Sequence, residues 1–205
     1  MPIRERIFAA LYDPLGARWE EKYGAAFRRE VLADARGRVL EIGVGTGLSF
    51  AHYSPEVELV GVEPSGPMLE RARARAAEVG REITLVQAAA EELPFEDGSF
   101  DTVVTIAVLC TVRDPQRALA EVRRVLRPDG RFVFAEHVRA TDPKLARWQD
   151  RLERPWGFFA GGCHPNRRTL EAIESAGFEV RDLEEGQVPG QPKLVRPSIK
   201  GWARA

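Results

Sequence analysis

The sequence predicts a doubly wound α/β fold with a mostly parallel sheet of seven strands. Five short apolar segments alternate with segments of helical periodicity, and a glycine-rich turn follows the first apolar segment. Such alternation implies right-handed crossover connections, a parallel sheet and helices on both of its faces. The 205 residues, 44% of them hydrophobic, suffice for one buried core but are few for two domains. We therefore expect a single domain over residues 1–205.

The first part of that domain, residues 1–36, is expected to be helical. Its apolar side chains recur at helical spacing from Gly16 to Ala35 and describe one amphipathic helix that leads into the sheet. Residues 37–138 then form the ligand-binding core. Strands are expected there at 38–43, 57–63, 83–87, 100–109 and 131–138, and helices at 48–53, 65–80 and 114–126. Ser65 and Asp114, each followed within two residues by proline, are placed to cap two of these helices.

The last part, residues 139–205, is expected to add an aromatic insertion and two closing strands. The insertion follows the fifth strand, contains Trp148, Trp156, Phe158 and Phe159, and ends in the glycine-containing run 161–165. A helix at 168–176 precedes strands at 178–183 and 195–203, and the last pair is expected to be antiparallel. We expect the insertion to serve as a lid on the acceptor side of the sheet.

Composition restricts the partners and the compartment. Thirty Lys and Arg against 31 Asp and Glu leave no positive field to gather phosphates, so nucleic acid is not expected as a partner. Cys110 and Cys163 lack the paired spacing of a zinc or redox motif, which predicts neither a metal site nor a disulfide. Residues 1–16 hold one short apolar stretch interrupted by charges and Pro14, which predicts no transmembrane segment and no signal peptide. We expect a cytoplasmic monomer or homodimer, with peripheral membrane contact left open.

The most informative motif is the glycine-rich turn after the first strand, where an open α/β sheet binds ligands. Gly43, Gly45 and Gly47 let the backbone approach a ligand, and their G-x-G-x-G spacing differs from the G-x-G-x-x-G of dinucleotide-binding loops. The negative charge of Glu41 suits a ligand with an ammonium and a sulfonium better than a pyrophosphate. Glu63, at the end of the second strand, can accept two hydrogen bonds from ribose hydroxyls, the alternative being a surface carboxylate.

Four motifs together carry a resemblance to a known family. They are VLEIGVGTG at 39–47, GVEPS at 61–65, EELPFEDGSFD at 91–101 and VLRPDG at 125–130. Through them the chain resembles the class I S-adenosylmethionine-dependent methyltransferases over most of residues 38–138. The resemblance implies their Rossmann-like fold, S-adenosylmethionine as cofactor and S-adenosylhomocysteine as product. It also implies that Glu41 lies near the methionine ammonium and Glu63 on the ribose.

The other cofactor contacts are expected near the ends of the following strands. They are Pro64, Met68, Ala89, Ala90 and Ala107. Met68 is placed to pack on the adenine, although ordinary core packing is the alternative. One position departs from the family pattern. Many relatives carry an aspartate near the adenine amine where this chain has three alanines at 88–90, which leaves the backbone and Glu91 as candidates for that contact.

Two residues are candidates for the chemistry on the acceptor side. His137, at the end of the fifth strand, is placed to orient or deprotonate an acceptor, and Cys110 closes the fourth strand. A structural histidine and a space-filling thiol are the alternatives. An apolar acceptor pocket, or a cover for the core, is expected from Trp148, Trp156, Phe159 and Cys163.

A narrower resemblance covers nearly the whole chain after residue 37. It rests on AVLCTV at 107–112, FAEHV at 134–138, the aromatic segment 148–167 and LVRPSIKGWA at 194–203. These segments resemble the alkyl thiol S-methyltransferase family, typified by membrane-anchored mammalian enzymes and their soluble bacterial relatives, and imply a small lipophilic thiol or hydrogen sulfide as acceptor. Two features depart: residues 1–16 lack the apolar anchor, and Ser198 replaces the histidine of the family's Arg-Pro-His-Ile tail.

Two alternatives remain open at this point. The stretch EIGVGTGLSF also resembles bacterial phosphatidylethanolamine N-methyltransferases, which implies a lipid or small-amine acceptor. The arginines near the N-terminus are interleaved with acids, a poor match to the basic face that lipid binding prefers. The second alternative is a protein that binds S-adenosylmethionine without catalysis. Against it, the aromatic insertion and His137 argue for an open catalytic cavity.

Overall fold

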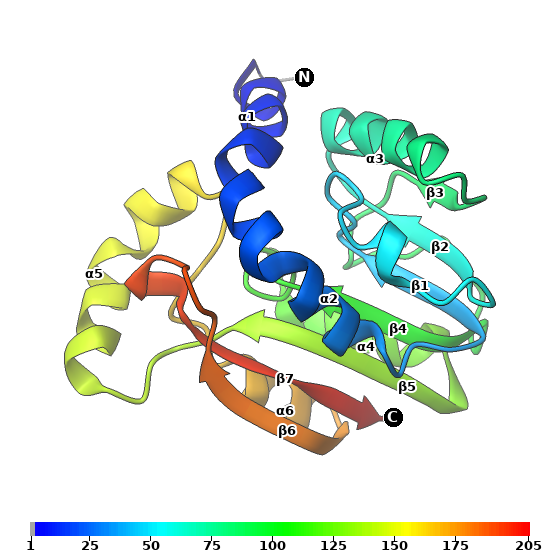
Figure 1. The fold of residues 1–205 in the computed structure, drawn as a ribbon. Coiled ribbons are helices and arrows are strands. Elements are labelled where there is room, and N and C mark those ends of the chain that lie inside the picture. Colours follow the sequence, from blue (N-terminus) through cyan, green and yellow to red (C-terminus); the bar gives the residue numbers. More distant parts are fainter. Residues whose placement is uncertain (1–2) are drawn as a thin grey trace.

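The seven expected strands form one sheet. A computed structural model, which describes residues 3–205, orders them β3-β2-β1-β4-β5-β7-β6 (Figure 1). The strands are β1 (Arg38–Ile42), β2 (Glu58–Val62), β3 (Thr84–Val86), β4 (Phe100–Ile106), β5 (Leu126–His137), β6 (Glu179–Gln187) and β7 (Pro197–Arg204). β1 to β5 pair in parallel, whereas β7 lies antiparallel between β5 and β6. The doubly wound α/β prediction is confirmed, including the antiparallel closing pair.

Helices cover both faces of this sheet. The α-helices are α1 (Ile3–Trp19), α2 (Ala25–Leu32), α3 (Gly66–Glu78), α4 (Pro115–Val125), α5 (Pro143–Phe159) and α6 (Thr169–Ser175). Short turns of π-helix at Glu20–Gly24 and of 3-10 helix at Phe50–His52 and Lys193–Val195 complete the set. Because strand side chains alternate between faces, Val39 packs with α2 and α3 while its neighbour Leu40 packs with α4 and α6. Two apolar cores result, one on each side of the sheet.

The N-terminal helical segment is longer than the periodicity predicts. Helix begins at Ile3 and passes through a π-helical turn before α2, whereas the sequence indicates one helix over 16–35. Gly24 lies in that turn, where an added Cβ would come within 2.4 Å of the Glu20 carboxyl group. Glycine thereby lets Glu20 fold back and bind Arg28, with N···O distances of 3.0 and 3.2 Å. Met1 and Pro2, the start of the expected segment 1–36, lie outside the described residues.

Three core elements have different lengths from those expected. The helix expected at 48–53 is only a 3-10 turn. The strand expected at 100–109 stops at Ile106, because Ala107 adopts a left-handed backbone with φ 56°. The strand expected at 131–138 starts earlier, since Leu126 already pairs with Phe100 across a register shift.

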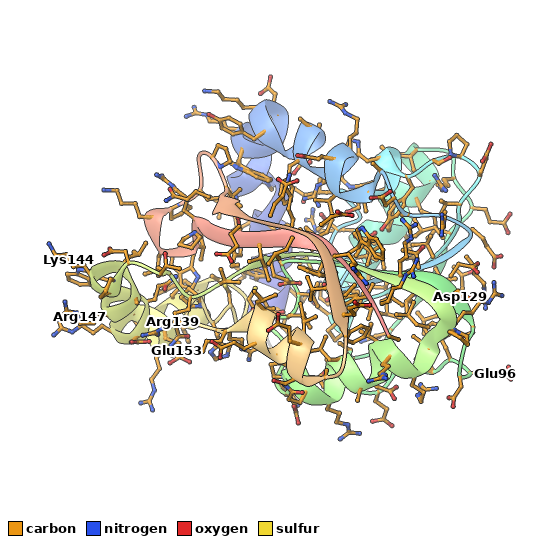
Figure 2. All side chains as sticks on the ribbon, turned by 90° about the horizontal axis from the view of Figure 1, so that it is seen from below. Glu96, Asp129, Arg139, Lys144, Arg147 and Glu153 are labelled. Atoms are coloured by element: carbon orange, nitrogen blue, oxygen red, sulfur yellow. The ribbon has the colours of Figure 1, made fainter. Side chains whose placement is uncertain are left out.

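The aromatic insertion contains a helix that sequence reasoning missed. α5 occupies Pro143–Phe159, where we expected an irregular segment. Its N-terminus carries the same Asp-Pro signal as α4: the Asp142 carboxylate accepts hydrogen bonds from the amides of Lys144 and Leu145, as Asp114 does from Gln116 and Arg117. The signal was present in the sequence, but Pro155 and the aromatic run obscured the periodicity. At the outer end of α5, Lys144 and Arg147 point away from the rest of the molecule (Figure 2).

Candidate cofactor and acceptor site

The glycine turn presents one open position at the carboxyl edge of the sheet. Gly43, Gly45 and Gly47 all have positive φ, at 69°, 57° and 82°. A Cβ on Gly43 would lie 2.6 Å from Val108, and one on Gly47 would lie 2.4 Å from Phe50. A Cβ on Gly45 would meet no atom within 4 Å. The outer glycines therefore permit close packing, whereas Gly45 leaves space where a ligand can approach the backbone.

Glu63 connects the glycine turn to the end of β2. Its Oε2 accepts a hydrogen bond from the Gly45 amide at 3.0 Å, and its Oε1 accepts one from the Ser65 amide at 2.9 Å. Burial raises the pKa of Glu63, while these two amides oppose the shift. Each carboxylate oxygen keeps a second acceptor site. The residue expected on the ribose thus lies beside the open face of Gly45.

Glu41 is buried under the same turn and has partners that sequence reasoning did not identify. Its Oε2 accepts a hydrogen bond from the Tyr53 hydroxyl at 3.1 Å. Arg28 donates to the Ser49 hydroxyl at 3.2 Å, and its positive charge favours the ionised form of Glu41. Burial outweighs these effects and raises the pKa of Glu41 to about 7. A carboxyl group in this state gains from the approach of a cation, which fits the expected methionine ammonium.

Helix α1 is hydrogen-bonded to the glycine turn. The Thr46 hydroxyl donates to Asp13 of α1 at 2.6 Å, and Arg75 of α3 pairs with the same carboxylate at 2.8 Å. Arg75 also donates to the Thr46 carbonyl at 2.9 Å. Figure 1 shows α1 between α3 and α5, above the edge where β1 and β2 end. Asp13 is a residue of this region that no sequence motif indicated.

The residues expected around the adenine lie after β2 and β3. Met68 and Ala90 are buried, whereas Pro64 and Ala89 are exposed. Glu91 is engaged elsewhere, because its Oε1 accepts hydrogen bonds from the amides of Arg113 and Asp114 at 2.7 and 3.2 Å. Its structural role in holding the start of α4 makes it a poor candidate for the adenine contact.

On the acceptor side, three of the expected residues, Cys110, Trp156 and Cys163, gather in one small apolar cluster. The cluster consists of Ala107, Cys110, Trp156, Ala160, Cys163 and Val195. The two cysteine sulfur atoms are 3.8 Å apart and both residues are buried. Spacing along the chain hid a contact that the fold creates between residues 53 positions apart.

Glu136 holds part of the backbone of this cluster by hydrogen bonds, and it was not singled out in the sequence. The side chain is buried at the end of β5, and its oxygens accept hydrogen bonds from the amides of Val108 and Cys110 at 3.1 and 3.4 Å. Burial raises the pKa of Glu136 to about 7 against these hydrogen bonds. The carboxyl group thus holds the turn that follows Ala107. Its position next to His137 in FAEHV was the available signal.

His137 lies at the end of β5, opposite Ser198 of β7. Its Nδ1 is buried and has no hydrogen-bond partner among residues 3–205. Burial lowers the pKa of the ring to about 4, although a hydrogen bond to the Val195 backbone opposes the shift. Val195 belongs to the acceptor-side cluster. The ring is therefore neutral at physiological pH, and its buried Nδ1 is unpartnered within residues 3–205.

Two expected pocket residues lie elsewhere. Trp148 is 55% exposed and Phe159 is 76% exposed, and neither belongs to the acceptor-side cluster. The reason is that α5 packs on the rest of the molecule through one face, and Trp148 and Phe159 are not on that face. The helix buries Ala146 and Gln149, and the Gln149 amide hydrogen-bonds to the backbones of Ala140, Val138 and Leu194. Of the tryptophans in the insertion, Trp156 alone joins the cluster.

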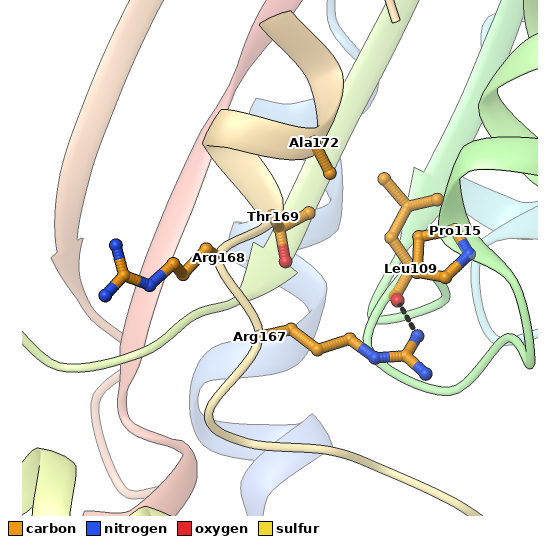
Figure 3. A pocket seen from close by; sticks show the side chains of 6 residues that line it. All are labelled: Leu109, Pro115, Arg167, Arg168, Thr169 and Ala172. Atoms are coloured by element: carbon orange, nitrogen blue, oxygen red, sulfur yellow. Dashed lines mark hydrogen bonds between the residues drawn. The ribbon is translucent and has the colours of Figure 1, made fainter. Parts of the chain in front are cut away.

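A separate pocket lies between α4 and α6 (Figure 3). It encloses about 120 Å³ and is lined by Leu109, Pro115, Arg167, Arg168, Thr169 and Ala172. Pockets for drug-sized ligands hold about 300–1,000 Å³, so this one is too small for a nucleoside cofactor. The Arg167 guanidinium extends along it and donates to the carbonyls of Leu109 and Val112. No cluster of metal-ligating side chains occurs in the part of the chain that the structure describes.

Comparison with known proteins agrees with this geometry. Residues 40–134 match a family described as a methyltransferase domain. Thiol S-methyltransferase TMT1A of Homo sapiens is 38% identical over 80% of this chain and 69% of its own length. Phosphatidylethanolamine N-methyltransferase of Cereibacter sphaeroides is 42% identical, over 57% of this chain and 62% of its own. A methyltransferase structure from Thermotoga maritima superimposes with a TM-score of 0.72, 23% identity and coverage of 98% and 99%.

The family match and the fold are those of a methyltransferase that uses S-adenosylmethionine as its cofactor. The residues present fit that cofactor, since Gly45 leaves open space beside Glu63 and Glu41 is a buried carboxyl group that a cation would favour in its ionised form. Within this class, the chain belongs to the family that contains the thiol S-methyltransferase TMT1A. No helix within residues 3–205 is long and apolar enough to cross a membrane.

Proposed function

We propose that this enzyme methylates a small lipophilic thiol. The observation that carries the proposal is the apolar character of the acceptor-side cluster around Cys110, Trp156 and Cys163. A neutral thiol enters such a site at little cost, whereas an amine arrives as an ammonium ion that must lose its hydration. The name of the human relative, thiol S-methyltransferase, supports the same acceptor class.

The residues of the chain have distinct parts in this reaction. S-adenosylmethionine supplies a methyl group on a positively charged sulfur. Glu63 and the open face of Gly45 bind the nucleoside, and Glu41 attracts the cationic end. The apolar cluster excludes water, so the acceptor sulfur is held close to the methyl carbon in a weakly solvating environment.

His137 is suited to accept a hydrogen bond rather than to remove a proton from a weak acid such as an ammonium group. Its ring is neutral because burial lowers its pKa to about 4, and Nδ1 is available to the acceptor S–H. A weak base of this kind can assist a thiol, whose pKa of about 8.5 lets it ionise nearly unaided. It would give little help to an ammonium group with a pKa of about 10. The state of His137 therefore favours the thiol.

A lipid amine is the second candidate, and a different observation favours it. Four apolar residues at four-residue intervals, Ile3, Ile7, Leu11 and Leu15, are exposed along α1. A stripe of this kind suits contact with a lipid interface. The relative from Cereibacter sphaeroides is named for phosphatidylethanolamine. Under this alternative, the acceptor would reach the site from a membrane surface.

The acceptor is tested with purified protein and methyl-labelled S-adenosylmethionine. Small alkyl thiols, hydrogen sulfide, phosphatidylethanolamine vesicles and simple amines are offered in parallel, and products are identified by mass spectrometry. Labelled thioether is expected. Label confined to lipid or amine would replace the proposal with the second candidate. Cofactor binding without labelled product would favour a non-catalytic binder, and Glu63→Ala serves as the background control.

Cellular location and assembly stay predictions. We propose a cytoplasmic protein that is a monomer or homodimer, in line with the sequence expectation. Fractionation of cells that express the full chain checks the location, and light scattering of the purified protein checks its mass. Recovery with membranes that salt cannot wash off would contradict the first of these predictions.

A further inference from the structure

Two thiols face each other in the acceptor-side cluster. The Sγ atoms of Cys110 and Cys163 are 3.8 Å apart, and the residues are 1% and 6% exposed. Their backbones are held together as well, because the His164 amide donates to the Cys110 carbonyl at 2.8 Å. A disulfide has an S–S distance of about 2.05 Å, so each sulfur need move by less than ~1 Å to form one. The backbone contact already sets the two side chains in reach.

The surroundings make the two thiols unequal. The hydrogen bond with Cys163, burial and the nearby Glu136 all raise the pKa of Cys110. The pKa of Cys163 is lowered, first by its hydrogen bond with Cys110 and then by the indole N–H of Trp156. The indole N–H is buried and has no hydrogen-bond acceptor at normal distance and angle within residues 3–205. The positive charge of Arg167 also favours the Cys163 thiolate. Cys163 is the better nucleophile, and Cys110 is placed to resolve its oxidised form.

We propose that Cys110 and Cys163 form a redox modification site that hydrogen peroxide converts into a disulfide. The Cys163 thiolate attacks one peroxide oxygen, the O–O bond breaks, and hydroxide leaves with the electron pair to give a sulfenic acid. The Cys110 sulfur then attacks the sulfenic sulfur, an S–S bond forms, and the S–O bond breaks. Hydroxide from the two steps takes up the thiol protons. In sum, two thiols are oxidised and one peroxide is reduced to two waters.

The cross-link would join the two segments that enclose the cluster. Cys110 lies in the turn after β4 that Glu136 holds, and Cys163 follows the C-terminus of α5. Gly162, which precedes Cys163, has a positive φ of 92°, a backbone conformation that favours glycine. A covalent bond here prevents the α5 end from moving away from the β4 turn. The cross-link would thereby block entry of an acceptor. This consequence rests on the proposed function, whereas formation of the disulfide does not.

The bond is tested on the full chain after reduction, desalting and exposure to hydrogen peroxide. Peptide mapping under non-reducing conditions is expected to show a Cys110–Cys163 linked peptide within one chain, reversed by dithiothreitol. In Cys110→Ser, a sulfenic acid at Cys163 should accumulate and react with dimedone, whereas Cys163→Ser should give far less adduct. Two unlinked thiols after peroxide, in protein that still binds S-adenosylmethionine, would overturn the proposal.

A second readout separates this site from the acceptor assignment. Oxidised wild-type protein is expected to keep its calorimetric affinity for S-adenosylmethionine and to lose at least tenfold in thiol turnover. Measured against its own reduced form, Cys163→Ser should lose far less turnover at the same exposure. If the linked peptide forms and turnover is unchanged, the blocking role is refuted while the disulfide stands. If no thiol is methylated even by reduced protein, the proposed function fails independently of the cross-link.

Discussion

At the scale of single residues, burial controls the chemistry of the site. Glu41 and Glu136 both have pKa values raised to about 7 because their carboxyl groups lie in the interior. Their neighbours differ: Glu41 lies under the glycine turn, whereas Glu136 binds amides of the turn after β4. The same rise in pKa therefore occurs in two different surroundings. We expect the binding of a cation to lower the pKa of Glu41 and not that of Glu136.

Cofactor binding is predicted to release a proton through Glu41. A positive group close to Glu41 lowers its pKa from about 7, so the carboxyl ionises on binding at pH 6 to 7. Calorimetry in buffers of different ionisation enthalpy measures this release. Glu41→Gln should abolish it, and Glu136→Gln, the matched control, should retain it. Equal release from all three proteins would show that another group titrates.

Removal of Glu63 is predicted to weaken cofactor binding selectively. Glu63→Ala deletes an acceptor for ribose hydroxyls and for the amides of Gly45 and Ser65, at a cost of about 1–3 kcal/mol. Titration calorimetry with S-adenosylhomocysteine gives the affinity. The exposed Glu58, at the start of the strand that precedes Glu63, supplies the control Glu58→Ala, which should bind as the wild type does. An unchanged affinity in Glu63→Ala would remove its assignment to the ribose.

For His137, turnover is predicted to suffer more than cofactor binding. In His137→Ala the hydrogen bond to the acceptor is lost, and kcat should fall about 10²-fold or more if the ring handles the proton. The pKa of His137 is already about 4, so the wild-type rate should show no inflection near 6.5 and should rise towards the pKa of the acceptor thiol. Equal losses of binding and turnover would instead indicate a structural histidine.

At the scale of elements, the N-terminal helix is fastened to the cofactor loop by one carboxylate. Asp13 of α1 binds both Thr46 of the glycine turn and Arg75 of α3. The two partners are the glycine turn and the helix that follows Glu63. Asp13 thereby links α1 to the glycine turn and to α3.

Loss of that carboxylate is predicted to speed cofactor exchange. In Asp13→Ala, the end of α1 separates more readily from the glycine turn, so the dissociation rate of S-adenosylhomocysteine should rise several-fold. Stopped-flow displacement measures the rate, and circular dichroism shows whether the helix content is kept. Glu5→Ala, a change at an exposed residue of the same helix, is the control. Identical rates in both variants would mean that α1 does not restrain the cofactor.

At the scale of the whole molecule, the buried titratable groups make stability depend on pH in opposite directions. Glu41 and Glu136 have raised folded-state pKa values, so the folded chain binds more protons than the unfolded chain between about pH 4.5 and 7. Stability from these groups falls as pH rises through that window. His137 acts oppositely, because its lowered pKa makes stability fall as pH drops from about 6.5 to 4.

Two carboxyl groups against one imidazole predict a net decline in stability from pH 5 to 7 in the cofactor-free protein. Urea denaturation at several pH values measures the free energy of unfolding. The double variant Glu41→Gln and Glu136→Gln should show a shallower decline or a reversed slope, since only the His137 contribution remains of the three. A wild-type curve that rises steeply with pH would contradict the shifts of both carboxyl groups.

The parts of this protein that the sequence by itself determined are those that depend on neighbours along the chain. The strand and helix alternation, the turn of Gly43, Gly45 and Gly47, and the Asp114 cap follow from local periodicity, backbone freedom and short-range hydrogen bonds. The placement of Glu63 at a strand end also follows, because parallel strands bring their carboxyl ends to one edge.

Only the tertiary structure decided which distant groups meet. The contact between Cys110 and Cys163, the approach of Arg28 to Ser49 and the bond from Asp13 to Thr46 join segments that share no local pattern. The exposure of Trp148 and Phe159 likewise depends on how α5 is rotated on the sheet. Packing sets these relations, since the free energy of burial depends on all the surfaces that come together and not on the order of residues within one segment.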